Sequence, residues 1–171
     1  MGRGVVFMKK TIILNLENIK IEGDILDVAC ENSGIVCSFS EEAKEEMALD
    51  KAYDDIESIK DKKYDACTFF FNLNSLWTLN KKEALIDEVS ECLKDNGEIY
   101  IWDINKNVGE LVDSKLRVLL PNGKIDEYNI KNNNIFSSSN YEETKSILEK
   151  TFVIEETKVW EDVYFIKGVK I

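Results

Sequence analysis

The chain has 171 residues, of which 44% are hydrophobic, and its 22 Lys and Arg against 33 Asp and Glu give a formal net charge of −11. This length and apolar content predict a single domain over residues 1–171 and exclude a disordered tail or a small disulfide scaffold. The negative charge argues against binding to nucleic acid or to an anionic membrane surface. Histidine is absent, which excludes Ser-His-Asp and Cys-His catalysis and imidazole-based zinc sites.

The four cysteines form no CxxC pair and show no spacing typical of metal ligands, so we predict buried, reduced thiols and no metal site. The apolar stretch Val5–Met8 is too short for a signal peptide and is followed by two lysines. No apolar run approaches the length of a membrane span. These features predict a cytoplasmic protein.

In chain order, apolar runs alternate with charged stretches, a pattern typical of a parallel sheet flanked by helices. After an N-terminal extension over residues 1–22, strands are predicted at Ile25–Cys30 and Ile35–Phe39. Ser40, followed by two glutamates, is expected to open a short polar helix. The next strand, Tyr64–Phe71, is apolar on both faces, which predicts a position in the middle of the sheet.

A helix is predicted over Lys81–Lys94, because its apolar residues recur at helical spacing and Asn80 can cap its start. A fourth strand follows at Glu98–Asp103. Beyond it, Leu116–Leu120 and Lys124–Ile130 flank a Pro-Asn-Gly turn, which predicts an inserted hairpin.

The C-terminal part begins with a polar loop over Lys131–Ser138. Ser139 and Glu142 then form a capping box that predicts the start of a helix. The β-rich runs Phe152–Trp160 and Val163–Val169 are separated by only two residues, so they predict an antiparallel hairpin at the end of the chain.

Several segments together resemble the class I S-adenosylmethionine-dependent methyltransferases. Gly23–Gly34 (GDILDVACENSG) is similar to the family's first-strand motif, and Lys63–Leu76 to its fourth strand and following loop. Leu93–Asp103 resembles the family's turn into the fifth strand, and Phe152–Lys167 resembles its terminal hairpin. The resemblance implies a Rossmann-like α/β fold with a mostly parallel sheet, a C-terminal antiparallel β-hairpin, and three α/β/α layers with a reduced helix layer.

The resemblance also implies S-adenosylmethionine as cofactor and assigns candidate site residues. The cofactor-binding candidates are Asp27, Ala29, Glu31, Gly34, Ser38, Asp55, Ile56 and Asn72; the substrate candidates are Asn74 and Trp77; and Asp103 is the candidate base. Ordinary structural roles are the alternative: a strand-end acid for Asp27, a solvated acidic face for Asp55, and core or rim packing for the tryptophans. Methyl transfer depends mainly on alignment and exclusion of water, so it tolerates the lack of histidine.

Two departures from the family pattern bear on the cofactor. Ala29, Glu31 and Ser33 stand where the family has glycines that let the backbone approach the cofactor. In addition, Asp27 and Asp65 are too close in sequence for two further strands and two full helices between them, so a helix after the first strand has been lost. Both departures predict weakened or lost cofactor binding.

Two functions therefore remain open. One is a methyltransferase-like protein that acts on a small-molecule acceptor with weakened or lost cofactor binding. The alternative is a catalytically inactive methyltransferase-fold protein that serves as a binding or interaction module for a protein partner. A flavodoxin-like or dinucleotide-binding protein fits less well, because neither class predicts the terminal antiparallel hairpin.

Overall fold

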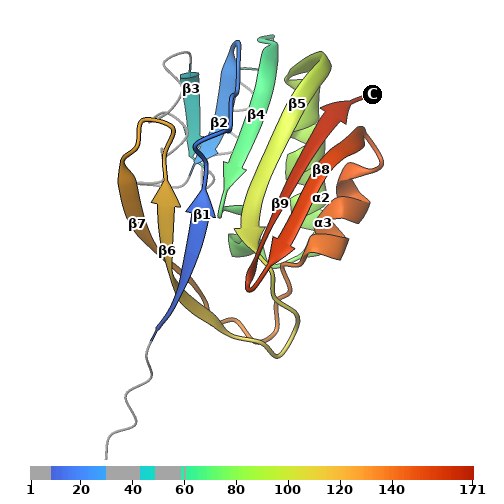
Figure 1. Cartoon of the computed structure of the whole chain (residues 1–171). Helices are drawn as coiled ribbons and strands as arrows, with labels where there is room; N and C mark the ends of the chain where they lie inside the picture. Colours follow the sequence, from blue (N-terminus) through green and yellow to red (C-terminus); the bar gives the residue numbers. More distant parts are fainter. Residues whose placement is uncertain (1–8, 30–42, 49–58, 60) are drawn as a thin grey trace, which may run out of the picture.

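The structure is a computed structural model that describes residues 9–29, 43–48, 59 and 61–171. Its strands form one sheet of six and one sheet of three (Figure 1). Several predictions fall on residues outside the described part: the strand Ile35–Phe39, two of the four cysteines, and the site candidates Glu31, Gly34, Ser38, Asp55 and Ile56. The other two cysteines, Cys67 and Cys92, are buried and free, as predicted.

The six-stranded sheet has the order β3-β2-β4-β5-β9-β8. Its strands are β2 (Ile25–Ala29), β3 (Ala43–Ala48), β4 (Tyr64–Phe70), β5 (Leu93–Ile104), β8 (Phe152–Trp160) and β9 (Val163–Lys170). The first four strands of this order are parallel, whereas β9 is antiparallel to β5 and to β8. The prediction of a terminal antiparallel hairpin is confirmed, and β4 lies inside the sheet between β2 and β5, as its two apolar faces predict.

The second sheet consists of β1 (Lys10–Asn15), β6 (Val112–Leu119) and β7 (Ile125–Asn132), in the order β1-β6-β7. β6 and β7 form the predicted inserted hairpin. β1 pairs with β6 in parallel and comes from the segment predicted as an N-terminal extension. Ile12 and Leu14 of this strand belong to the core between the two sheets.

Two helices pack on the six-stranded sheet, α2 (Leu79–Glu91) and α3 (Tyr141–Leu148). Their caps differ from the predicted ones. Thr78 rather than Asn80 accepts the backbone N–H of Lys81, at 3.3 Å. Asn140 rather than Ser139 caps α3 by accepting from Glu143. Both predicted helices exist, but sequence spacing alone misplaces each cap because neighbouring polar residues can serve equally well.

The prediction of three α/β/α layers is wrong for the described residues. One face of the six-stranded sheet carries α2 and α3, and the other face carries the three-stranded sheet (Figure 1). The core between the two sheets includes Ile12, Leu14, Leu116, Val118, Phe70, Trp102 and Phe165. The core under the helices includes Leu85, Val89, Leu148, Phe69, Ile101 and Tyr164. The architecture is thus helices, mixed sheet, and a second sheet.

The polar helix predicted to open at Ser40 is also wrong over residues 43–48, which form the strand β3. The sequence AKEEMA consists of good helix formers. Pairing with the buried strand β2 supplies backbone hydrogen bonds along a parallel register, and this tertiary context overrides the local preference.

Two adjacent isoleucines of β1 test whether this strand belongs to the core. Ile12 is 1% exposed between the sheets, whereas Ile13 is 68% exposed. We predict that Ile12→Ala lowers the free energy of unfolding by about 3 kcal/mol, because it removes buried methyl groups and leaves a cavity. The matched substitution Ile13→Ala should change it by less than about 0.5 kcal/mol. Urea unfolding measures both, and equal effects would show that β1 does not pack on the sheet.

Candidate functional site

The candidate site lies at the carboxyl edge of the parallel strands. From β2 the chain goes to β3 on one side, and it then returns to β4 on the other side of β2. This reversal is a topological switch point, and open α/β sheets bind ligands in the crevice outside the strand ends at such a point. The residues that follow β2 and β4 are therefore the first to consider.

Asp27 lies within β2, two residues before its end. Its side chain is almost completely buried and accepts a hydrogen bond of 2.7 Å from the hydroxyl of Thr68 on β4. Its neighbours Leu26 and Val28 belong to the core under the helices, so strand alternation directs Asp27 to the opposite face. In this position the carboxylate links the two strands on either side of the switch point.

Asn72 lies at the switch point, two residues after the end of β4. Its side chain is 3% exposed and donates a hydrogen bond from Nδ2 to the backbone carbonyl of Val28 on β2. Its own carbonyl accepts hydrogen bonds from the backbone N–H and the hydroxyl of Ser75. The Asn72 amide therefore connects the segment after β4 to the end of β2, at the edge where the resemblance implies a cofactor.

Asp103, the candidate base, lies near the end of β5 and is completely buried. Its carboxylate accepts hydrogen bonds from the backbone N–H of Asn74 at 3.0 Å, from Asn74 Nδ2 at 2.8 Å and from the N–H of Ile104 at 2.7 Å. Asn132 at the end of β7 donates to the carbonyl and the side-chain oxygen of Asn74. Asn74 thus joins β5, β7 and the short 3-10 helix η3 (Leu73–Ser75) in one buried network.

Burial raises the pKa of Asp103 to about 6, although its hydrogen bonds and the charge of Lys82 act in the opposite direction. Lys82, in the first turns of α2, is itself buried and donates to the carbonyl of Ser138 at 2.7 Å. Burial lowers the pKa of Lys82, and Asp103 partly offsets this effect. Tyr164 is also buried near Asp103, shares a hydrogen bond of 2.7 Å with Thr144, and has a pKa raised by burial.

A second lysine, Lys106 after the end of β5, is also buried. Its ammonium group donates to the carbonyls of Asn134, at 2.8 Å, and of Ser137. Lys82 and Lys106 together hold the backbone of the segment between β7 and α3. Residues 131 and 132, predicted as the start of this loop, belong to β7 instead. Neither lysine stands in a recognisable motif, because each acts through backbone carbonyls that sequence does not specify.

The structure does not bring all the predicted site residues together. Trp77 is 74% exposed, so it does not line the buried network. Asp27 and Asp103 lie on opposite faces of the six-stranded sheet. The residues on either side of Asp27 face the helices, and those on either side of Asp103 face the second sheet. Ala29 ends β2, and nothing further is described of its surroundings. Trp102 is core, stacked on Phe165 with ring centroids 4.9 Å apart.

Within the described residues, no group of His, Cys, Asp or Glu side chains is arranged to hold a metal ion. The helices of the same residues are all too short or too polar to cross a membrane.

Of the cofactor-binding candidates, only Asp27 and Asn72 have described side chains. Both are buried, and each is bound to a neighbouring strand of the protein itself. A ligand that displaced the Asn72 amide would leave the Val28 carbonyl without that donor. An unsatisfied buried polar group costs about 1–3 kcal/mol.

The raised pKa of Asp103 predicts a specific pH dependence of stability. The pKa of about 6 in the folded protein exceeds the ordinary value of 3.8, so the folded chain binds the proton more tightly than the unfolded chain does. We expect the free energy of unfolding to fall by about 3 kcal/mol as pH rises from about 4 to about 6, and then to level off. Asp103→Asn does not titrate and should lack this fall. Chemical unfolding of both proteins across this range measures the difference, and parallel pH curves would contradict the prediction.

No protein-family model matches the chain, and no curated protein matches it in sequence. Among solved structures, it is similar to an S-adenosylmethionine-dependent methyltransferase from Methanosarcina mazei, with a TM-score of 0.56 and 13% identity over 90% of this chain and 94% of that one. It is also similar to one from Clostridium acetobutylicum, with a TM-score of 0.55 and 14% identity over 86% of this chain and 83% of that one. A third similar structure is the N-methyltransferase NodS of Bradyrhizobium japonicum in complex with S-adenosyl-L-homocysteine, with a TM-score of 0.54 and 11% identity over 86% of this chain and 77% of that one. At these identities the likeness concerns the fold alone, in which the chain is similar to these methyltransferases.

Proposed function

We propose that the chain is a methyltransferase-like protein whose binding of S-adenosylmethionine is weakened or lost, and whose ligand at the carboxyl edge is a small molecule. The observation that carries the proposal is the Asn72 amide, which is buried at the switch point and bound to the Val28 carbonyl. The absence of glycines at Ala29, Glu31 and Ser33 supports it independently, because close approach of a ligand to backbone favours glycine.

Asp103 has a structural role in this proposal. A general base must reach the proton that it removes, directly or through one water. Asp103 is completely buried, and its two oxygens already accept hydrogen bonds from Asn74 and Ile104. We therefore assign this carboxylate to holding the loop after β4, with Lys82 as the nearby compensating charge.

A second candidate function, association with a protein partner, is favoured by apolar side chains exposed near the same edge. The backbone N–H of Gly109 donates to the carbonyl of Ile135 at 2.7 Å, which brings the loop after β5 beside the loop after β7. These two loops and the start of α2 expose Val108, Leu111, Ile135, Phe136, Trp77 and Leu79, with Phe136 84% exposed. Exposed apolar residues that gather in one region are typical of interaction surfaces.

Calorimetry with S-adenosylmethionine and S-adenosyl-L-homocysteine tests the first proposal. We predict that the wild-type chain shows no saturable binding of either compound below millimolar concentration. Asn72→Ala removes the amide that is bound to the Val28 carbonyl at the switch point, so it should tighten binding by about tenfold, or ~1.4 kcal/mol.

The control for this prediction is Ser75→Ala, which removes a hydrogen bond to the Asn72 carbonyl but leaves the amide in place. It should bind the two compounds as the wild-type chain does. Micromolar binding by the wild-type chain, or weaker binding by Asn72→Ala, would contradict the proposal. Methyl transfer by the purified wild-type chain at micromolar S-adenosylmethionine would contradict it as well.

A further inference from the structure

The second sheet is narrower than the sheet that it covers. It has three strands against six, and β1 is its edge strand on the side of the β8–β9 hairpin. Residues of β2, β4, β5 and β9 pack beneath it, whereas Trp160 at the end of β8 is only partly buried. A strip of the six-stranded sheet therefore extends beyond the edge strand β1, and within it Trp160 is only partly covered while Trp102 and Phe165 are buried.

A hollow of about 210 Å³ lies along this strip. Trp102 and Phe165 contribute buried, stacked aromatic rings, with ring centroids 4.9 Å apart. Leu14 and Ile13 of β1 line one side, and Trp160 of β8 lines the other. Ligand pockets are typically apolar and aromatic with a few polar groups that fix orientation, and this composition matches that description.

Among the described residues that line the hollow, Lys158 is the one with a charge. It forms an exposed ion pair with Glu156, with Nζ and Oε1 3.1 Å apart. Exposed ion pairs of this kind contribute only about 0–1 kcal/mol to the free energy of unfolding, so a ligand anion can compete for the ammonium group. In a chain with a net charge of −11, a lysine beside an apolar hollow selects an anionic group.

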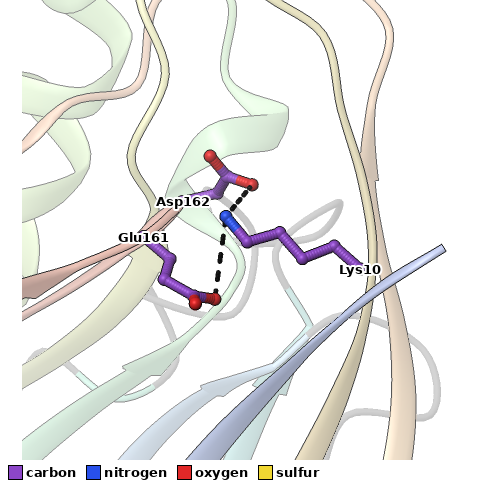
Figure 2. Close-up of polar contacts among 3 residues, drawn as sticks. All are labelled: Lys10, Glu161 and Asp162. Atoms are coloured by element: carbon purple, nitrogen blue, oxygen red, sulfur yellow. Dashed lines mark hydrogen bonds and ion pairs between the residues drawn. The ribbon is translucent and has the colours of Figure 1, made fainter.

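Ion pairs close the gap between the sheets at one end. Figure 2 shows Lys10, from the start of β1, reaching across to Glu161 and Asp162 in the turn between β8 and β9. The ammonium nitrogen lies 3.7 Å from Glu161 Oε2 and 3.4 Å from Asp162 Oδ2. This contact bridges the gap beside the hollow, so an extended peptide paired with β1 could not continue past it. A short ligand fits this geometry better than an added strand does.

From these observations we infer that the hollow between β1 and the β8–β9 hairpin binds a small aromatic molecule with an anionic group. The ring lies against Trp102, Phe165 and Trp160, and the anion pairs with Lys158. This site is distinct from the switch point and does not depend on methyl transfer.

A ligand-observed NMR titration with 2-naphthoate, and with 2-naphthalenemethanol as its uncharged counterpart, tests the inference. The wild-type chain should bind 2-naphthoate saturably and more tightly than the alcohol. Lys158→Gln should raise the Kd of 2-naphthoate about fivefold and leave that of the alcohol unchanged, because only the anion uses the lysine. Trp160→Ala should weaken both compounds, because it removes part of the apolar wall.

Glu156→Gln should lower the Kd of 2-naphthoate, whereas Lys158→Gln should raise it. It frees Lys158 from its partner and should tighten 2-naphthoate about twofold. Asp87→Asn is the matched control, because it makes the same charge change on α2, across the six-stranded sheet from the hollow. Lys124→Gln, in the turn between β6 and β7, is the matched control for Lys158→Gln.

Several results would overturn the inference. Non-saturable binding of 2-naphthoate to the wild-type chain would do so, as would equal effects of Lys158→Gln and Lys124→Gln. Loss of binding in Phe136→Ser, with Trp160→Ala unaffected, would place the compound on the exposed loops instead. Circular dichroism and thermal unfolding of each variant separate a change in the hollow from a loss of folding. Substitutions of Lys158 and Glu156 are the least prone to unfold the protein, because both side chains are exposed.

Discussion

β4 and β5 present apolar side chains on both faces, and this constraint determines the architecture. Phe69 and Ile101 face the helices, while Phe70 and Trp102 face the opposite side. Burial of such surface contributes about 25 cal/mol for each Å² removed from water, so neither face can remain open. Helices cover one face. On the other, the chain uses a strand from before β2 and a hairpin from after β5, which together form a second sheet.

Sequence patterns predicted those elements whose signals are local. The period of the helices, the two-residue separation of β8 and β9, and the uninterrupted apolar run of β4 all correspond to observed elements. β1 and β3 could not be predicted in the same way. β3 is composed of helix formers and becomes a strand only because β2 offers a partner, and β1 finds its partner about a hundred residues further along the chain. The choice of a sheet instead of helices as the second covering layer follows from these non-local pairings.

Residue types near the strand ends suggested candidate site residues, but they did not indicate the contacts that each residue makes. Asp27, Asn72, Asn74 and Asp103 are all polar and near strand ends, as the resemblance implies, yet each is buried and bound within the protein. The buried lysines that complete the network donate to backbone carbonyls, which every residue possesses. Breaking one member of a buried polar network leaves its partner unsatisfied, so the network favours a single arrangement of the loops at this edge.

The parallel pairing of β1 with β6 has a consequence for how the molecule is assembled. During synthesis β1 leaves the ribosome early, but Ile12 and Leu14 pair opposite Leu116 and Val118. The second sheet cannot form until β6 has emerged, and non-local parallel pairing is a slow step that exposes unpaired edges to aggregation. Lys9 precedes this strand and Lys10 begins it, and both can act as charged gatekeepers during that interval. The N-terminal strand is thus the first part of the core to be made and among the last to be buried.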